Sequence, residues 1–288
     1  MTSQNRALIL GIITIVCWGS LATFGNLLIH LPPFFVLGVC FLLGSLPAFT
    51  HFKEMFPSLK ITILGTLGYF GYHFFLFYSF RYAPAVEANL INYMWPVLMV
   101  MVTPYFFPQE RLRWFHFLGA FLAVLGCALL VFGAEAESKG EEIYLGYLLA
   151  AGAAITWPTY SIVKKKMPPT SLWAVGGFCL GASLLSFLTH FLIEPHVVLQ
   201  TPDALKLLVM GLGPFGIAFY CWDKACHLGD TKVLGALAYL TPVISTLGLV
   251  FFAGKSLSLS TGIAMVLIIG GASAGLLDFL PSKTLKKA

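Results

Sequence analysis

Charged side chains are scarce in this chain. They make up 10% of its 288 residues, while hydrophobic side chains make up 58%; a typical soluble domain carries about 25% charged residues. The charges are clustered, and most stretches between them reach the roughly 20 apolar residues that a helix needs to cross a bilayer. This composition excludes a soluble globular fold and predicts an all-α polytopic membrane protein.

Ten transmembrane helices are expected from the charge-free runs. The first run, 7–52, is long enough for two helices and is interrupted at Leu31-Pro32-Pro33, where proline removes the helical N–H. The run that begins at Leu207 is short and needs flanking residues such as Ala204 or Ala225. The other runs are 61–80, 88–109, 114–134, 143–163, 167–193, 233–254 and 256–277.

Groups typical of catalytic, metal or nucleic-acid sites are also missing. The six cysteines lie singly in apolar runs, without the paired spacing of metal ligands. No cluster of His, Asp and Glu falls at membrane depth, so no enzyme, metal site or cofactor is expected. Gly211, Gly213 and Gly216 match a dinucleotide-binding pattern by letter, but that pattern requires a preceding strand. The chain has a net charge of +5, but its sequence shows no basic face with interleaved aromatics, which would indicate nucleic-acid binding.

The positions of lysine and arginine predict the orientation in the membrane. With the N-terminus in the cytoplasm, all but four of the 17 lysines and arginines fall in cytoplasmic segments. The four exceptions are Arg81, Lys139, Lys206 and Lys255. Because positive residues concentrate on the cytoplasmic side, both termini are expected to be cytoplasmic and the acidic segment 135–142 to lie outside.

The chain repeats itself at a period of about 140 residues. Trp18-Gly19-Ser20 in the first expected helix is answered by Trp157-Pro158-Thr159 in the sixth. Each copy holds five expected crossings, an odd number, so the second copy must enter the membrane from the opposite side. The sequence therefore predicts two inverted five-helix repeats, residues 1–138 and 139–288, an architecture that places transport sites between the repeats.

Two prolines, Pro96 and Pro242, stand at corresponding places in the two copies, each within a segment expected to be helical. Because proline has no N–H, the carbonyls of Asn92 and Ala238 lose their usual helical partners. In a bilayer, such carbonyls are tolerated where they line a cavity or meet a polar group. The pair predicts a midplane cavity with Pro96 and Pro242 as hinges; ordinary helix kinks are the alternative.

Eight side chains are candidate residues of a substrate cavity. Asn92 and Trp95 share one helix face, as do Trp157 and Tyr160, and a ligand with a zwitterionic head and an apolar tail would need such a mixture. His73 could titrate and couple transport to protons, with a neutral hydrogen-bonded imidazole as the alternative. Since aromatic residues make up 15% of the chain, plain packing competes for each ring. The set is Trp18, His73, Tyr78, Asn92, Trp95, Trp157, Tyr160 and Tyr239.

The motifs resemble those of the drug/metabolite transporter superfamily, EamA type, and within it the YddG-type aromatic amino acid exporters. The likeness rests on Trp18-Gly19-Ser20, on 77–83 leading to Pro96, and on Tyr220-Cys221-Trp222 leading to 239–243. It covers nearly the whole chain and implies export of aromatic and other neutral amino acids across a bacterial inner membrane. The implied partners are an amino acid substrate and the lipid bilayer; a monomer is the working expectation, with dimerisation left open.

Two other functions stay open. One is export of another small metabolite or drug, although the first helix carries no carboxylate like the one at the centre of the small multidrug antiporters of the superfamily. The other is a passive channel, although the sequence has no ring of like charges or filter motif. A secondary transporter that works by alternating access, with the two halves rocking about a central cavity, fits the repeat better.

Overall fold

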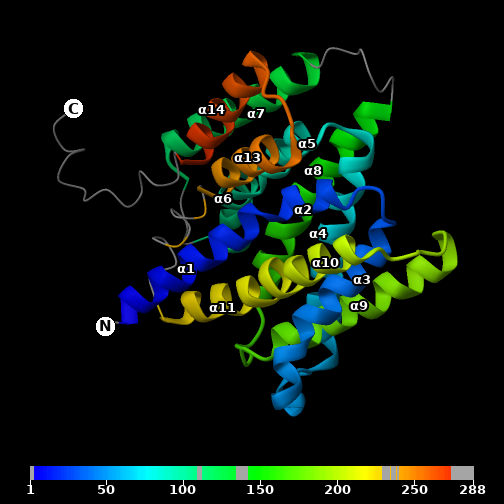
Figure 1. Cartoon of the computed structure of the whole chain (residues 1–288). Coiled ribbons are helices and arrows are strands. Elements are labelled where there is room, and N and C mark those ends of the chain that lie inside the picture. The colour runs from blue at the N-terminus through cyan, green and yellow to red at the C-terminus, as the bar shows by residue number, and fades with distance from the viewer. Residues whose placement is uncertain are drawn as a thin grey trace.

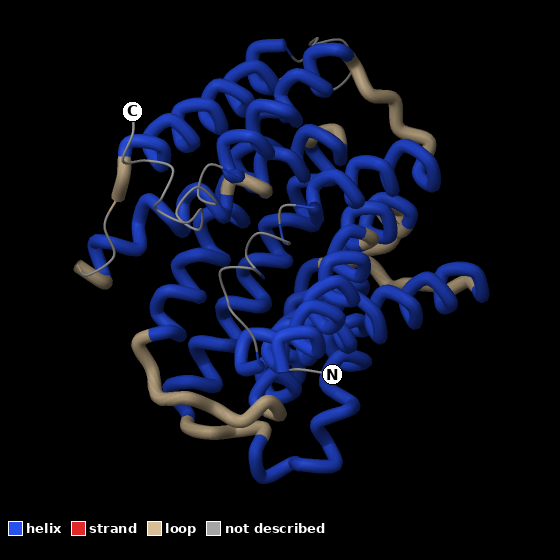
Figure 2. Tube along the Cα trace, turned by 90° about the vertical axis from the view of Figure 1, so that its left-hand side faces the viewer, coloured by secondary structure: helices blue, strands red, loops and turns tan. Residues whose placement is uncertain are grey.

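The computed structural model describes residues 3–108, 112–133, 142–228, 234, 238 and 240–273. All regular secondary structure in these residues is helical, and the described part of the chain contains no strand (Figure 2). Helices satisfy their own backbone hydrogen bonds, which a bilayer interior requires. The expected all-α class is therefore confirmed.

The N-terminal part of the chain forms seven α-helices and one 3₁₀-helix. The first expected apolar run divides where Pro32 and Pro33 stand, because Pro33 opens a new helix at its first position. The elements are α1 (Ser3–Gly19), α2 (Leu21–Leu27), α3 (Pro33–Ser45), η1 (Leu46–Glu54), α4 (Leu59–Tyr82), α5 (Ala85–Asn92), α6 (Trp95–Phe106) and α7 (Trp114–Gly133).

The C-terminal part forms the remaining helices. The short run at Leu207 extends in both directions, as expected, into a continuous stretch from Thr201 to Cys226 that includes one π-helical turn. Gly211, Gly213 and Gly216 lie within this stretch, so their match to a dinucleotide-binding pattern has no structural basis. The elements are α8 (Glu142–Lys165), α9 (Ala174–Ile193), α10 (Thr201–Leu212), η2 (Gly213–Ile217), α11 (Ala218–Leu228), α13 (Leu240–Ala253) and α14 (Leu259–Ser273).

Six helical stretches are long and apolar enough to cross a membrane: Asn5–Leu27, Pro33–Glu54, Leu59–Tyr82, Ala85–Phe106, Ala174–Ile193 and Thr201–Cys226. Three further helices are also apolar but shorter: Trp114–Leu129, Leu240–Ala253 and Leu259–Gly271. The helix α8 is 24 residues long and more polar at its ends. The total of ten crossings and the inversion of the second copy stay predictions.

The fourth expected helix is one helical stretch, Ala85–Phe106, with a local interruption at Tyr93 and Met94. α5 ends at Asn92, and α6 starts at Trp95 with Pro96 in its first turn. Between them, the N–H of Tyr93 donates to the carbonyl of Asn89 (3.1 Å) and that of Met94 to the carbonyl of Ile91 (3.0 Å). This tight turn lies at the place where the proline was expected to weaken the helix.

The helices fall into two groups that are in extensive contact, because α5, α6 and α13 of the second group pack mainly against helices of the first. In the first, α4 packs on α8, α3 on α9 and α10, and α1 on α11. The second contains α5, α6, α7, α13 and α14, with α7 and α14 in extensive contact; Figure 1 shows these helices together at the top of the view. Contacts of α8 with α5 and α6, and of α13 with α1 and α2, join the groups along a seam.

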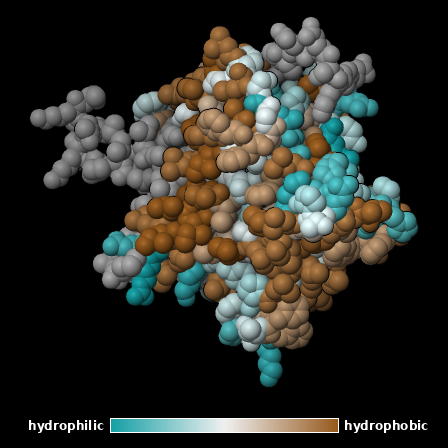
Figure 3. All heavy atoms as spheres, in the orientation of Figure 1, coloured by the Kyte–Doolittle hydropathy of each residue, from teal (hydrophilic) through white to brown (hydrophobic). Residues whose placement is uncertain are grey.

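The outer surface of the helix bundle is strongly apolar. Figure 3 shows hydrophobic residues spread over much of the visible face. Large hydrophobic side chains exposed on several helices include Phe121, Leu148, Phe191, Phe251 and Phe252. Soluble monomers rarely expose contiguous apolar patches larger than a few hundred Å². Such a surface is suited to contact with lipid tails.

Small residues allow the helices of the first group to approach closely. A Cβ atom added to Gly177 on α9 would overlap the carbonyl oxygen of Met55, and one added to Gly181 would overlap the Thr66 side chain on α4. Because Met55 meets Gly177 with backbone atoms, it cannot move aside as a flexible side chain would. This close approach is the packing role expected of small residues in membrane helices.

Replacing Gly177 by alanine is therefore expected to destabilise the protein by about 1–3 kcal/mol, the usual cost of overpacking. Gly270→Ala is the matched control, since nothing lies within 4 Å of a Cβ at Gly270 on α14. Thermal unfolding in detergent should show a lower midpoint for Gly177→Ala and an unchanged or higher one for the control. Equal midpoints would contradict the close contact between α9 and Met55.

Candidate functional site

A cavity lies on the seam between the two helix groups. Its empty space, including the part that is open to solvent, is about 540 Å³. The first group contributes mainly aromatic side chains, and the second contributes most of the polar ones. The lining residues are Trp18, Leu21, Tyr72, His73, Leu76, Asn89, Asn92, Tyr93, Trp95, Trp157, Phe219, Ala238 and Thr241.

Aromatic rings in edge-to-face and tilted contact form one wall of the cavity. Trp157 is central to this wall, with its ring centroid 5.2 Å from that of Tyr72 and 6.3 Å from those of Trp18 and Phe219. Trp18 and Phe219 are themselves 5.7 Å apart. Aromatic pairs favour these separations and angles, so the same rings can receive a further aromatic ring from a ligand.

The opposite wall carries two buried asparagines on one face of α5. Asn89 donates from Nδ2 to the hydroxyl of Ser245 on α13 at 2.8 Å. Asn92 donates from Nδ2 to the hydroxyl of Tyr72 on α4 at 3.2 Å. The first bond holds α5 against α13, and the second links the two helix groups across the cavity.

His73 lies at the base of the aromatic wall. Its Nδ1 donates to the carbonyl of Tyr69 at 2.8 Å, which assigns the ring proton to Nδ1 because a carbonyl only accepts. The imidazole packs against Phe41 and Phe215, with centroids 5.0 and 4.7 Å away. This setting favours a neutral, hydrogen-bonded imidazole; coupling of transport to a proton at His73 stays a hypothesis.

Five of the eight side chains predicted from the sequence line the cavity: Trp18, His73, Asn92, Trp95 and Trp157. Tyr160 lies behind the lining, with its ring 5.6 Å from Trp157. Tyr78 packs elsewhere, against Phe34 and Phe74 at 5.4 and 5.0 Å. Tyr239 lies outside the described residues. Whether a substrate touches any of these side chains stays a prediction.

Each of the two predicted hinge prolines follows a cavity-lining residue in the sequence. Pro96 follows the lining residue Trp95, and Pro242 follows the lining residue Thr241. Pro242 is the third residue of α13. The residues whose carbonyls were expected to lose their helical partners, Asn92 and Ala238, both line the cavity. The hinge role itself stays a prediction.

Several lining residues were missed from the sequence, chiefly Tyr72, Asn89, Tyr93 and Phe219. Asn89 lies three residues before Asn92, so helical spacing alone places both amides on one face. Phe219 had no comparable signal, because its position depends on the π-helical turn of η2 just before it. Within the described residues, no group of three or more His, Cys, Asp and Glu side chains is placed to hold a metal ion.

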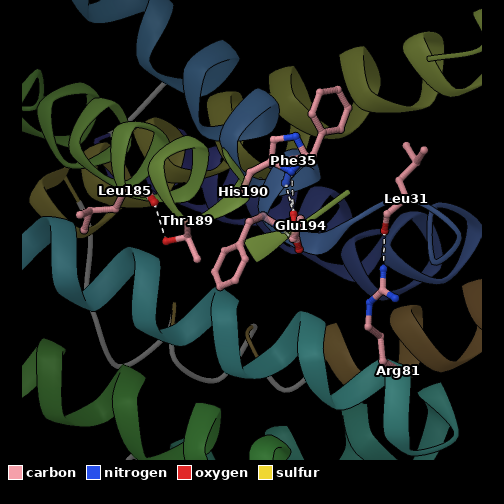
Figure 4. A network of polar contacts seen from close by, with 8 residues as sticks. Leu31, Phe35, Arg81, Leu185, Thr189, His190 and Glu194 are labelled. Carbon is pink, nitrogen blue, oxygen red and sulfur yellow. Dashed lines mark hydrogen bonds and ion pairs between the residues drawn. The ribbon is translucent and has the colours of Figure 1, made fainter. Parts of the chain in front are cut away.

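A polar network ties the two halves of the sequence together at the end of the bundle where α3 begins and α9 ends (Figure 4). The Glu194 carboxylate accepts hydrogen bonds from the main-chain N–H groups of Phe34 and Phe35 at 3.0 and 3.2 Å. It also lies 2.9 Å from Nδ1 of His190. The residue before α3 is Pro32, whose side chain cannot cap a helix, so Glu194 from α9 satisfies these free N–H groups instead.

The same end carries a second set of charges. Asp203 at the start of α10 lies 2.9 Å from Nε2 of His30 and 2.9 Å from Nζ of Lys206. Arg81 at the end of α4 donates to the carbonyl of Leu31 at 2.6 Å (Figure 4). Together with Glu194, these contacts fasten the segment between α2 and α3 to α4, α9 and α10.

Comparison with known proteins identifies the family. The model of the EamA-like transporter family matches residues 5–132 and, a second time, 144–274. The aromatic amino acid exporter YddG of Ancylobacter novellus is 36% identical over 284 residues, which cover 96% of this chain and 98% of that protein. The aromatic amino acid exporter YddG of Salmonella typhimurium is 27% identical and covers 94% and 97%. A solved crystal structure superposes with a TM-score of 0.75 at 35% identity, over 99% of this chain and 100% of that chain. The chain therefore belongs to the EamA-like transporter family and is a multi-pass transporter of the bacterial inner membrane.

Proposed function

We propose that this protein exports aromatic and other neutral amino acids by alternating access through the cavity between the two helix groups. The observation that carries the proposal is the cavity wall of Trp18, Tyr72, Trp157 and Phe219, whose ring contacts suit an aromatic side chain. The names of the relatives from Ancylobacter and Salmonella support the same substrate class.

The charge of the lining favours a substrate without net charge. Among the described lining residues there is no Asp, Glu, Lys or Arg. A permanently charged ligand would be buried there without a counter-ion, which is costly. A zwitterionic amino acid carries no net charge and needs only hydrogen-bonding groups for its head. Neutral amino acids therefore fit better than cationic drugs or phosphorylated metabolites.

The arrangement of helices supports two five-helix repeats, residues 1–138 and 139–288, and the positions of lysine and arginine favour cytoplasmic termini. The family model matches once in each repeat. When each expected crossing is exchanged for the one five places away, the contacts of α3 with α9 and of α7 with α14 map onto themselves. The contact of α4 with α8 maps onto that of α1 with α11. Two structural repeats are expected to show this exchange symmetry, and an odd number of crossings in each would make the second repeat inverted.

We propose that the moving units are these two helix groups and that they differ from the two repeats. Each of the two helix groups contains helices from both halves of the sequence, and the cavity lies where the groups meet. Rocking along this seam would open the cavity to one side and then to the other. Pro96 and Pro242 belong to the second group, where the interruption between α5 and α6 would absorb the motion.

Replacing Pro96 by alanine tests this hinge. The alanine N–H can bond to the Asn92 carbonyl and restore a continuous helix. The transport rate is expected to fall about fivefold, equivalent to about 1 kcal/mol on the barrier, while thermal stability is retained. Pro104→Ala, inside α6 and away from the cavity lining, is the control and should transport at the normal rate. An unchanged transport rate for Pro96→Ala would contradict the hinge and indicate that the interruption between α5 and α6 serves only packing.

Counterflow in proteoliposomes tests the proposed function. Vesicles that hold purified protein should take up labelled phenylalanine saturably, and faster when preloaded with unlabelled phenylalanine. Saturation and acceleration are properties of a carrier, whereas a channel shows neither. Linear uptake would favour the channel, and no uptake of phenylalanine, tryptophan or leucine would favour export of another metabolite.

A further inference from the structure

The α5 side of the cavity holds an amide oxygen that is not satisfied within the described residues. Asn92 is 2% exposed and lines the cavity. Its Nδ2 donates to the Tyr72 hydroxyl, while its Oδ1 is buried without a hydrogen-bond partner there. Nearly all buried polar atoms in proteins are paired, so an exception calls for an explanation. The location of this oxygen in the cavity supports one explanation, namely that a ligand supplies the missing hydrogen-bond donor.

Two main-chain carbonyls of cavity-lining residues are further candidate acceptors. The carbonyl of Asn92 cannot receive its usual helical bond because Pro96 has no N–H, and the carbonyl of Ala238 is in the same position relative to Pro242. The turn between α5 and α6 uses the carbonyls of Asn89 and Ile91. Asn92 and Ala238 both line the cavity. The two proline-bearing segments thus bring main-chain acceptors to the site, besides the side-chain donors of Trp95 and Thr241.

The site suits a cationic group whose charge is balanced by an anionic group of the same ligand. An ammonium has three N–H donors and no acceptor, so it needs oxygens of this kind. Indole faces such as those of Trp95 and Trp157 stabilise nearby cations. The one ring N–H of His73 already donates to the Tyr69 carbonyl and is not free for a substrate carboxylate.

We propose that Asn92 Oδ1 and the main-chain carbonyls of Asn92 and Ala238 bind the α-ammonium group of the transported amino acid. This assignment rests on the proposed function and gives one part of the substrate a definite place. The aromatic side chain then lies against Trp18, Trp157 and Phe219, and the carboxylate is the less tightly held group. Asn92 would be a specificity-determining residue for compounds with a free amino group.

Two analogues of phenylalanine separate the contributions of its charged groups. Phenylalaninamide keeps the ammonium and lacks the carboxylate, whereas 3-phenylpropanoate keeps the carboxylate and lacks the ammonium. Each is used to compete with labelled phenylalanine for binding to the purified full chain. Loss of a hydrogen bond to a charged group weakens binding about tenfold or more, so 3-phenylpropanoate should compete at least tenfold more weakly than phenylalaninamide.

Substitution of Asn92 by leucine, which has a similar shape, locates this preference. Asn92→Leu should weaken phenylalanine and phenylalaninamide by about tenfold and leave 3-phenylpropanoate unchanged, so that the preference disappears. Asn26→Leu is the matched control, because Asn26 on α2 does not line the cavity. This variant should keep the ratio between the two analogues. A thermal unfolding profile confirms that each variant is folded before binding is measured.

Three results would overturn the inference. If 3-phenylpropanoate competes as well as phenylalaninamide, the ammonium is not the group that the site recognises. If Asn92→Leu weakens all three compounds equally, Asn92 has a structural role or holds the carboxylate. If phenylalanine itself does not bind to the folded wild-type protein, the proposed function fails together with this assignment.

Discussion

Alanine in place of Trp157 is expected to weaken phenylalanine binding at least tenfold and to abolish saturable transport at low substrate concentration. Trp157 contacts Trp18, Tyr72 and Phe219 at the cavity, and Tyr69 and Tyr160 behind it. Each aromatic pair contributes about 0.5–1.5 kcal/mol beyond the area that it buries. Removing the indole would therefore take away the main ring contact proposed for the ligand and loosen the rings that remain.

The control for this variant is Trp114→Ala. Trp114 opens α7 and is 66% exposed, so its loss should leave binding and transport unchanged. Trp157→Phe should recover part of the affinity because it restores a ring of smaller area. Equilibrium binding of labelled phenylalanine to detergent-purified protein measures all three variants. Wild-type affinity in Trp157→Ala would contradict the placement of the substrate side chain.

Alanine in place of Glu194 is expected to lower stability by about 3–5 kcal/mol, the usual effect of removing one partner of a buried charged contact. The Glu194 side chain is 5% exposed and accepts from the N–H groups of Phe34 and Phe35. Its loss would leave these donors and His190 without their carboxylate. The start of α3 would then separate from the end of α9.

Thermal unfolding in detergent measures this effect. Glu194→Gln should fall between wild type and Glu194→Ala, because its one amide oxygen can still accept from an N–H of α3. Glu142→Ala removes an exposed carboxylate at the start of α8 and serves as the control with an unchanged midpoint. A midpoint for Glu194→Ala equal to that of the control would show that the cap does not hold the two helices together.

Much of the fold follows from local features of the sequence. Pro32 and Pro33 divide the first apolar run, and the structure starts α3 at Pro33. The tight turn of Tyr93 and Met94 occurs where Pro96 removes a helical N–H. The long-range cap by Glu194 had no such signal, because it joins residues about 160 positions apart that meet only when α3 and α9 pack.

The cavity was predictable where helical spacing applied and less so where it did not. Asn92 and Trp95 were grouped by spacing, and both line the cavity. Tyr78 was selected from a sequence motif; at about 100° per residue it lies about 140° around α4 from His73 and faces away. Tyr72, next to His73, turns toward the seam instead. Spacing within a helix places residues on a face, but only the packing of other helices decides which face lines a cavity.

The most direct measurement is the position of a bound substrate. Crystals grown with 4-bromo-phenylalanine would give an anomalous signal at the bromine atom. The expected peak lies among the rings of Trp18, Trp157 and Phe219, with the ligand nitrogen within hydrogen-bond distance of Asn92 Oδ1. A peak elsewhere in the protein, or none in the cavity at saturating ligand concentration, would contradict the assignment of this cavity as the amino acid site.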